Sequence, residues 1–580
     1  MKISTCLSCL FIFGINASRD FLIDTSSCKM PLFDHFSEEA NRTYMYLPPI
    51  KCSEFDSLTH VTVENNTAHL RIRKKYLNQY YESDEEIDCC YSYIMRAGTP
   101  DEPDVGISWT ECHSFNSTVT LQEDTVMVKC YLGADKIYEN VHKSILISPD
   151  IYSKLKYSHK KQRRTKRKPL SVILMVIDSV SRLNFQRTMP QTRNYLLGND
   201  FVEFFGYNKI DDNTFPNFNA ILTGLNLNQS NAICKPNLVG YLDKCPMIWY
   251  DYRDQGYVTA YAEDWAQIST YNYLKKGFKE PPTDYYFKPY LEAAEDLLSV
   301  LTVDTMPFCA GHESEGERVL KLAQDFTKTF RYHPYFGIFW MNTFSHNHIN
   351  TPSRMDHTMK NFFENIKRNG ILNESMVIVL SDHGIRFGEV RHTVQGWYEE
   401  RLPANFISLP NWFQKAHPEK YENLKRNAHK LTSTYDLYMT LQEVLALSMN
   451  SHVAVGSKAC PSCQSLFSNI PYSRGCRQAG IPEVWCTCLG KFNENDSEIT
   501  VEVNNRAFRF LRESGRLKPG VLINKLLSSS VSRSPDGKSY FLINFETVQS
   551  NYLAGYQGLF EISLNPVVEF LSLLSFTRLY

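Results

Sequence analysis

One short segment of the sequence places a hydroxyl group where chemistry could occur. Residues 210–225 read IDDNTFPNFNAILTGL, a polar run with two aspartates that leads through Thr214 and Pro216 into an apolar, helix-like stretch. Proline is tolerated in the first turn of a helix, where its missing N–H would have no partner. The pattern predicts that Thr214 lies at or just before a helix N-terminus, where free N–H groups and the helix dipole favour an anion. An ordinary N-cap role for the threonine is the alternative interpretation.

Four short apolar runs also end in polar or charged residues. The runs are SVILMVIDS, GYVTAYAED, PYFGIFWMN and SMVIVLSDHG, and their ends carry Asp178, Glu263 with Asp264, Asn342 with His346, and Asp382 with His383. Continuous apolarity is typical of strands buried on both faces, as in a parallel sheet covered by helices. Because ligands bind beyond the carboxyl ends of such strands, the four ends together predict one site.

The residue types at these strand ends suit a divalent metal. Aspartate with histidine favours Zn²⁺, and Mn²⁺, Mg²⁺ or Ca²⁺ are the alternatives because carboxylates also bind harder ions. A hydroxyl beside such an ion can attack phosphorus or sulfur and split one displacement into two covalent steps. Thr214 is therefore the expected nucleophile and a metal ligand, together with Asp178, Asp382 and His383. The structural alternatives are a helix cap at Asp178 and a hydrogen-bonded histidine in a polar loop.

Length and composition limit the kind of protein. At 580 residues the chain exceeds one typical core, so roughly two or three domains are expected. Hydrophobic content of 43% and aromatic content of 13% describe a globular protein. The formal net charge of -1 gives no general attraction to nucleic acid or acidic membranes, so neither is an expected partner. No segment reaches the length expected of a stable membrane span.

The pattern changes along the chain predict five regions. We expect a signal peptide at 1–18, a disulfide-braced β domain at 19–155, a basic linker at 156–169, a catalytic α/β domain at 170–455 and a cysteine-rich β region at 456–580. Alternation in HVTVENNTAHLRIRKKY, STVTLQEDTVMVKCYL, EITVEVNNRAFRFL and KSYFLINFETVQS predicts strands in the two terminal regions. The run KYSHKKQRRTKRKP is expected to be an exposed linker because its charges favour water.

Several features indicate export into an oxidising compartment. MKISTCLSCLFIFGINAS has an early lysine, a short apolar run and small residues near Ala17, the plan of a secretory signal peptide. Disulfides are expected among the cysteines outside it, with zinc at CPSC or CTC as the alternative. These cysteines are Cys28, Cys52, Cys89, Cys90, Cys112, Cys130, Cys234, Cys245, Cys309, Cys460, Cys463, Cys476, Cys486 and Cys488. Glycosylation sequons are predicted at Asn41, Asn65, Asn116, Asn228, Asn373 and Asn495.

The motifs resemble a known superfamily. VIDSVSR at 176–182, DDNTFPNFNAILTG at 211–224 and SDHG at 381–384 are similar to the metal and nucleophile motifs of the alkaline phosphatase/sulfatase superfamily. TFPNxxxxxTG is similar to the nucleophile segment of nucleotide pyrophosphatase/phosphodiesterases. FWMNTFSHN, SDHGIRFGEVRHTVQGWYEERLP and CRQAGIPEVWCTC resemble the animal family called domain of unknown function 229, over nearly the whole mature chain. The reaction of that family is unestablished, so the resemblance implies an alkaline-phosphatase-like fold and a site more firmly than a substrate.

The resemblance implies one metal site more firmly than a second. Asp178, Thr214, Asp382 and His383 match the first site and its nucleophile. The phosphodiesterase pattern requires spaced histidines for the second site.

In that region this chain offers SHNHIN, with Asn350 in place of one of those histidines. His346 resembles the lone histidine of lipoteichoic acid synthase and phosphoethanolamine transferase relatives, which works with the metal or holds the phosphate. His348 and His392 are weaker candidates, expected at the surface or in support of the ligands.

One feature separates phosphate from sulfate chemistry. Type I sulfatases convert a Cys or Ser within C/S-x-P-x-R to formylglycine, whereas this chain has Thr214 followed by FPNF and lacks that arginine. The expectation is a secreted, extracellular hydrolase or transferase of phosphate esters, most favourably phosphodiesters. The alternatives are a sulfatase-like hydrolase of sulfate esters and a non-catalytic binding or matrix protein on the same fold. The expected partner is an extracellular phosphorylated or sulfated substrate whose identity the sequence leaves open.

Overall fold

The structure is a computed structural model. It describes residues 20–81, 87–165, 167–449, 451–492, 501–549, 552–563 and 569–579. The predicted signal peptide and the sequon at Asn495 lie outside these residues. The other five sequon asparagines are all exposed, as glycosylation would require: Asn41, Asn65, Asn116, Asn228 and Asn373. Their glycosylation stays a prediction.

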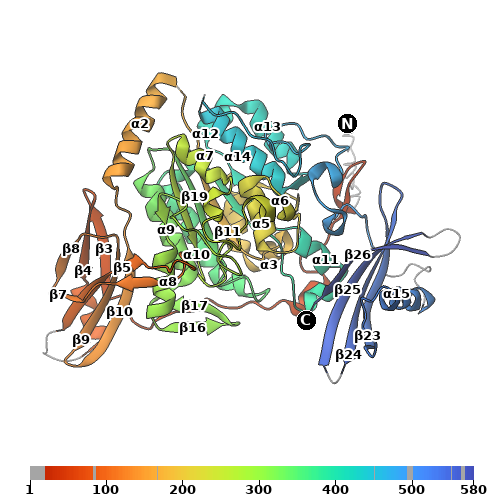
Figure 1. Ribbon diagram of the computed structural model, residues 1–580, viewed down its shortest axis with the longest axis horizontal. Coiled ribbons are helices and arrows are strands. Elements are labelled where there is room, and N and C mark those ends of the chain that lie inside the picture. The colour runs from red at the N-terminus through yellow and green to blue at the C-terminus, as the bar shows by residue number, and fades with distance from the viewer. Residues whose placement is uncertain are drawn as a thin grey trace, which may run out of the picture.

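A seven-stranded sheet forms the centre of the molecule, in the order β12-β21-β20-β11-β19-β14-β15 (Figure 1). The bounds of these strands are Val202–Glu203 (β12), Asn405–Ser408 (β21), Ser375–Leu380 (β20), Ser171–Ile177 (β11), Tyr335–Met341 (β19), Val258–Glu263 (β14) and Tyr285–Tyr286 (β15). Strands β20, β11, β19, β14 and β15 run parallel, and β21 is antiparallel to both of its neighbours. The predicted α/β fold with a mostly parallel sheet is confirmed.

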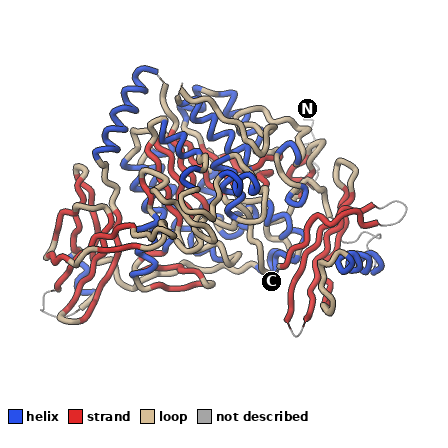
Figure 2. The backbone as a smooth tube through the Cα atoms, viewed as in Figure 1, coloured by secondary structure: helices blue, strands red, loops and turns tan. Residues whose placement is uncertain are grey.

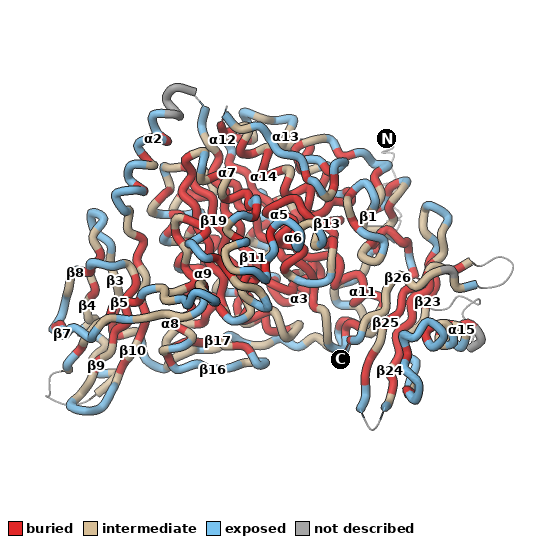
Figure 3. Tube along the Cα trace, viewed as in Figure 1, coloured by how far each residue is buried: buried red, intermediate tan, exposed pale blue. Residues whose placement is uncertain are grey.

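Helices cover both faces of this sheet, which explains why its strands are continuously apolar. In β11, Ile173 and Met175 enter the hydrophobic core on one face, whereas Leu174 and Val176 enter the core on the other. Helices of the first face are α3 (Arg182–Thr188), α4 (Pro190–Leu197), α8 (Lys288–Leu297), α9 (Glu315–Thr329) and α10 (Asp356–Arg368). Helices of the second face are α5 (Thr214–Thr223), α7 (Ile248–Asp254), α12 (Asn411–Ala416), α13 (Pro418–Asn427) and α14 (Thr434–Ser448). Buried residues accordingly concentrate in this central layer (Figure 3).

Smaller elements surround the central layers. They are the helices α1 (Glu38–Thr43), α6 (Leu227–Ile233) and α11 (Val394–Arg401), and the strands β13 (Gly206–Asn208), β16 (Val300–Val303), β17 (Met306–Ala310), β18 (Glu313–Ser314) and β22 (Leu431–Ser433).

The N-terminal β region lies at one end of the molecule and the C-terminal sheet at the other (Figure 2). The N-terminal region has two sheets, β3-β4-β8 and β10-β9-β5-β6, and β7 also pairs with β5. Their bounds are Thr59–Glu64 (β3), Thr67–Ile72 (β4), Asp88–Arg96 (β5), Ile107–Trp109 (β6), His113–Phe115 (β7), Thr118–Leu121 (β8), Thr125–Leu132 (β9) and Asp135–Lys143 (β10). The strands predicted from alternation in this region are confirmed.

The basic run expected to be a linker is largely helical. Helix α2 covers Pro149–Thr165 and projects from the body of the molecule (Figure 1). Ile151 and Leu155, one turn apart, are buried in the central core and hold the start of the helix. No glycine or proline interrupts residues 150–165, so the helix continues into the charged sequence.

The C-terminal sheet has the order β23-β24-β25-β26 and carries α15 on one face. The bounds are Val501–Glu513 (α15), Leu522–Arg533 (β23), Ser539–Gln549 (β24), Tyr552–Ser563 (β25) and Glu569–Arg578 (β26). The strand predicted in KSYFLINFETVQS is confirmed, but the strand predicted in EITVEVNNRAFRFL is wrong, because 501–513 form a helix. The buried positions are Val503, Ala507 and Leu511, which are spaced four residues apart. This spacing fits one face of a helix and not the every-second-residue pattern of a strand.

The seven disulfides pair all the cysteines for which disulfides were predicted, so that prediction is confirmed over zinc. They are Cys28–Cys488, Cys52–Cys309, Cys89–Cys130, Cys90–Cys112, Cys234–Cys245, Cys460–Cys463 and Cys476–Cys486. Cys28 belongs to a hairpin of β1 (Phe21–Asp24) and β2 (Lys29–Pro31) that shares a core with the C-terminal sheet. The hairpin therefore packs away from the β region to which the sequence assigned it. Among the described helices, none is long and apolar enough to cross a membrane.

Candidate metal centre

Two buried aspartates meet at the carboxyl ends of neighbouring strands. Asp178 follows β11 and Asp382 follows β20, and the pairing of Val176 with Leu380 brings the two ends level. Asp178 is 1% exposed and Asp382 is 0% exposed. Ligand atoms of Asp178, Asp382 and His383 all lie within 4.8 Å of one another. The parallel sheet thus brings together three of the four residues predicted for the metal site.

Backbone and hydroxyl groups fix the two carboxylates. Ser179 has a positive φ of 61°, and its N–H donates to Asp382 Oδ1 at 3.2 Å. The Ser179 hydroxyl donates to Asp178 Oδ1 at 3.0 Å. The Ser381 hydroxyl donates to the His383 carbonyl at 2.9 Å and so holds the turn after β20. The positive φ is unusual for a serine, and here it aims both groups of Ser179 at the aspartates.

The hydrogen bonding of His383 defines which ring nitrogen faces the aspartates. Nδ1 lies 2.9 Å from the Gly384 carbonyl oxygen, which can only accept, so Nδ1 carries the proton. Burial lowers the pKa of His383 to about 4, and therefore the ring is neutral near pH 7. The Nε2 lone pair then points at Asp382 Oδ2, 3.1 Å away, and at Asp178 Oδ1, 3.9 Å away.

This donor set fits a cation. Within the part of the chain that the structure describes, Asp382 Oδ2 is buried without a hydrogen-bond partner, although a lone pair of His383 faces it at 3.1 Å. Burial, and next the charge of Asp382, raise the pKa of Asp178 well above its ordinary value. Two carboxyl groups and a neutral imidazole nitrogen therefore converge, and both carboxyls can be ionised together only beside a compensating positive charge. A divalent ion bound by Asp178, Asp382 and His383 would compensate this charge.

Thr214 lies beside this cluster as the first residue of helix α5. Its Oγ1 is 3.4 Å from His383 Nε2, and its side chain is half-buried. The preceding turn is held by Asn217, which is fully buried: its Oδ1 accepts from the Ile210 N–H and its Nδ2 donates to the Asn213 carbonyl. The predicted position of Thr214 at the helix N-terminus is confirmed, and Asn213 occupies the N-cap position.

The three histidines proposed for a second site occupy different places. His346 Nε2 lies 4.0 Å from Asp178 Oδ2, and its ring contacts Trp265 and Phe387, with centroids 6.4 and 6.1 Å away. His348 instead accepts a hydrogen bond from the Asn350 N–H at 3.2 Å.

His392 lies in a short 3-10 helix, Glu389–His392, and its carbonyl accepts from the Ser528 hydroxyl of the C-terminal sheet at 3.2 Å. Only His346 of the three therefore approaches the aspartates.

The other predicted strand-end residues form a separate network. Asp264, after β14, accepts from the N–H of Asn342 at 2.5 Å and from the Thr343 hydroxyl at 2.8 Å. The Asn342 side chain donates to Glu263 Oε1 at 3.3 Å. The four strand ends do share one edge of the sheet, but the carboxylates of Glu263 and Asp264 accept hydrogen bonds from Asn342 and from nearby threonine hydroxyls.

The end of helix α11 joins three segments of the site, and sequence reasoning missed this role. The carbonyl oxygens of Glu400, Arg401 and Leu402 accept from the backbone N–H groups of Gly384, Lys209 and Arg182, at 3.0, 3.0 and 2.9 Å. The only signal in the sequence is the run of charged residues in WYEERLP, now seen to be buried.

Two cations lie near the centre. Lys209 is fully buried; its Nζ donates to the Asp212 carbonyl at 3.0 Å and pairs with Glu400. Arg386, part of the SDHGIRFGE segment, pairs with Asp212 at 3.3 Å at the edge of the site. Both cations help to lower the pKa of His383, after the larger effect of burial. They bring positive charge to the side of the site where Thr214 lies.

The chain belongs to the family described as "Protein of unknown function (DUF229)", whose model matches residues 46–515. This confirms the resemblance found in the motifs. No curated protein matches the chain.

Three solved structures illustrate the similarity in fold. Lipoteichoic acid synthase LtaP from Listeria monocytogenes has 14% identity and a TM-score of 0.35, covering 50% of this chain and 75% of its own. A protein in the alkaline phosphatase superfamily from Vibrio parahaemolyticus has 11% identity and a TM-score of 0.37, covering 70% and 82%. Phosphonate monoester hydrolase SpPMH from Silicibacter pomeroyi has 13% identity and a TM-score of 0.35, covering 68% and 89%. At these values the similarity supports no functional assignment, so the function rests on the geometry of the site.

Proposed function

We propose that the protein is a metal-dependent hydrolase or transferase of phosphate esters, most favourably phosphodiesters, with Thr214 as its nucleophile. The observation that carries the proposal is the Thr214 hydroxyl, 3.4 Å from His383 Nε2 beside two buried aspartates. A threonine that served only as an N-cap would need no such neighbours, and here Asn213, not Thr214, occupies the N-cap position.

Asp178, Asp382 and His383 would hold the ion. When bound, a divalent ion would lower the pKa of the Thr214 hydroxyl and neutralise negative charge on the phosphate. The Thr214 hydroxyl loses its proton to solvent as its oxygen attacks phosphorus, the bond to the leaving alcohol breaks, and the alcohol oxygen takes up a proton. The phosphoryl group then stays on Thr214 until water or an acceptor alcohol removes it.

The surrounding residues orient the anion. N–H groups of the first turn of α5 favour negative charge beside Thr214. Arg386, half-exposed and paired with Asp212 at 3.3 Å, is positioned to exchange that partner for a substrate oxygen. Burial lowers the pKa of His346, which makes it a neutral hydrogen-bonding group for the phosphate at pH 7.

We further propose that the protein acts in an oxidising, extracellular or secretory compartment. The proposal is supported by seven disulfides and by five exposed sequon asparagines.

The test combines metal content with turnover of three substrates. Wild type, Thr214→Ala and Thr214→Ser are assayed on bis-p-nitrophenyl phosphate, p-nitrophenyl phosphate and p-nitrophenyl sulfate. We expect diester cleavage, a loss of at least about 10³-fold in kcat in Thr214→Ala at unchanged metal content, and partial activity in Thr214→Ser.

Two results would contradict the assignment. Equal turnover by Thr214→Ala would refute the nucleophile, and preference for the sulfate would refute phosphoryl chemistry. Wild-type protein that retains no metal after dialysis and hydrolyses none of the substrates would instead favour a non-catalytic binding protein.

A further inference from the structure

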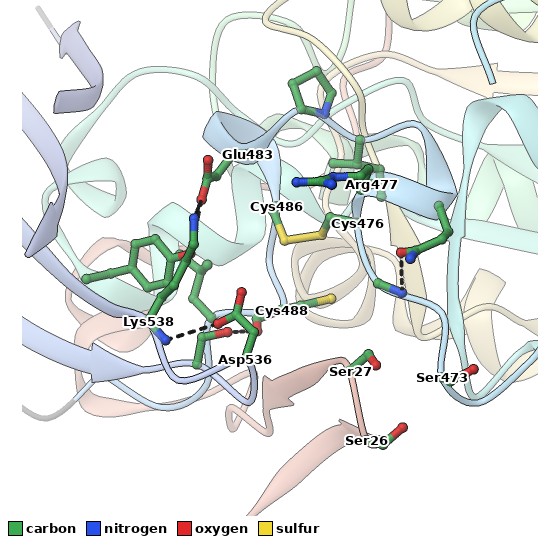
Figure 4. A pocket seen from close by; sticks show the side chains of 17 residues that line it. Ser26, Ser27, Ser473, Cys476, Arg477, Glu483, Cys486, Cys488, Asp536 and Lys538 are labelled. Atoms are coloured by element: carbon green, nitrogen blue, oxygen red, sulfur yellow. Dashed lines mark hydrogen bonds and ion pairs between the residues drawn. A yellow bond between two sulfur atoms is a disulfide. The ribbon is translucent and has the colours of Figure 1, made fainter. Parts of the chain in front are cut away.

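A cavity of about 520 Å³ is lined by residues other than those of the metal centre (Figure 4). It is formed where the cysteine-rich segment meets the turn of the β1–β2 hairpin and the turn between β23 and β24. Its walls include Ser26 and Ser27 from the first turn, Arg477 from the cysteine-rich segment, and Asp536 and Lys538 from the last turn. Most of the residues that line the cavity are polar or charged.

Two disulfides meet in this cavity. Cys476 is bonded to Cys486, and Cys488 is bonded to Cys28 of the hairpin. The Sγ atoms of Cys476, Cys486 and Cys488 all lie within 4.8 Å of one another. Thiol–disulfide exchange proceeds by attack of a thiolate on a disulfide sulfur, so a thiolate formed on Cys486 would have its next target beside it.

The four cysteines differ in exposure, and this difference determines which of them a thiol from solution reaches first. Cys476 is half-buried, whereas Cys486 is 8% exposed, Cys488 is 3% exposed and Cys28 is fully buried. A thiol from solution therefore meets Cys476 first. Arg477, exposed on the same cavity wall, adds a positive charge that favours the approach of a thiolate.

We propose that this cavity is a thiol–disulfide exchange site whose substrate is a small thiol, such as glutathione. The thiolate attacks Cys476 Sγ, the Cys476–Cys486 bond breaks, and a mixed disulfide forms on Cys476 as Cys486 leaves as a thiolate. Cys486 then attacks Cys488 Sγ, forming Cys486–Cys488 and releasing Cys28, which takes up a proton. One disulfide is lost and one is gained in each step, so no further oxidant is needed.

The exchange removes the covalent attachment of the hairpin. Cys28 and Cys488 are 460 residues apart in the sequence, and their bond fixes the β1–β2 hairpin against the end of the cysteine-rich segment. Without it, the hairpin is held by noncovalent contacts, such as the Gly490 N–H to the Lys29 carbonyl at 3.0 Å.

A second pair of disulfides in the chain provides a comparison for the pair at the cavity. Cys89–Cys130 and Cys90–Cys112 are also neighbouring disulfides, and Cys112 is exposed. Cys89 and Cys90, however, are successive residues of β5, so their side chains point to opposite faces of the sheet. Reduction of Cys90–Cys112 should therefore stop at that bond.

The experiment maps disulfides after exposure to reduced glutathione. The full chain is incubated with glutathione at mildly alkaline pH, quenched with acid, alkylated and analysed by mass spectrometry of non-reduced peptides. We expect glutathione on Cys476, a new Cys486–Cys488 bond and alkylation of Cys28 in equal yield. Glutathione on Cys476 with Cys28–Cys488 intact would overturn the proposal.

A matched pair of variants tests the order of events. Cys476→Ser combined with Cys486→Ser should slow the release of Cys28 at least about tenfold, because the attacking thiolate is missing. Cys90→Ser combined with Cys112→Ser should leave the release unchanged. Release of Cys28 at the wild-type rate in the first variant would refute the relay. The map of wild-type protein decides the question if that variant does not fold, and no outcome depends on the metal centre.

Discussion

Replacement of Asn217 is the most direct test of how the protein positions Thr214. The Oδ1 atom of Asn217 accepts from the N–H groups of Ile210 and Asp211 at 2.8 and 3.2 Å. Its Nδ2 donates to the carbonyls of Asp211 and Asn213 at 2.8 and 2.9 Å. Asn217→Asp keeps the size and the accepting oxygen but replaces the donor with a second acceptor.

The size of the effect follows from the two donor bonds. Leaving a buried polar group without its partner costs about 1–3 kcal/mol, so two carbonyls cost about 2–6 kcal/mol. Protonation of the new carboxyl can restore one donor, so the expected loss in free energy of unfolding is at least about 1–3 kcal/mol, the cost of the carbonyl that stays unpaired. A displacement of the reacting group by about 1 Å lowers the rate by about 10²-fold.

The assay separates positioning from stability. Thermal unfolding, bound metal and kcat/KM on bis-p-nitrophenyl phosphate are measured for wild type, Asn217→Asp and Asn219→Asp. Asn219 is the matched control because it is buried in the same helix, and its Nδ2 donates to Ser230 at 2.7 Å, away from the turn. We expect both variants to lose stability and only Asn217→Asp to lose about 10²-fold in kcat/KM per bound metal. Equal kcat/KM in the two variants would show that Asn217 does not place Thr214.

Two further predictions concern the metal loop and the pH dependence of stability. A Cβ on Gly384 would lie 2.2 Å from the Glu399 carbonyl oxygen, so Gly384→Ala should displace the His383 loop and weaken metal binding about 10–100-fold, measured by titration into dialysed protein. An unchanged affinity would contradict the assignment of His383 as a ligand. Burial lowers the pKa of His142 to about 3, below its ordinary value of 6.5, so the unfolded chain takes up the proton first. Stability should therefore fall as pH drops from 6.5 toward 3, by up to about 1.4 kcal/mol per pH unit. His142→Gln should reduce this slope in urea unfolding, and an unaltered slope would refute the role of His142.

Much of the site could be predicted because its signals are local. Apolar strands with polar ends, and a proline just inside a helix that follows Thr214, depend on neighbouring residues alone. The strands of the central sheet and the positions of Asp178, Asp382 and His383 at its edge agree with those predictions. The location of the second set of histidines could not be predicted, because it depends on loops whose course is set by distant contacts.

Two errors have a common physical cause. The residues of α2 and α15 were expected to form a linker and a strand, but both form helices. The apolar residues of a short amphipathic segment can match both the helical period of 3.6 and the strand period of 2, so the surface that it packs against decides between them. A charged run can be helical when residues of its first turn are buried against the rest of the protein. Burial of Leu155 in one core and of Ala507 in another decided the two cases.

The sequence by itself determined the residue types of the site, its place at the ends of parallel strands, and the use of cysteine for disulfides. Tertiary structure alone decided how those parts are held. The end of α11 accepts hydrogen bonds from Gly384, Lys209 and Arg182, and Cys28 pairs with Cys488 across 460 residues. Such contacts join segments far apart in the chain, and local propensity carries no information about which distant segments will meet.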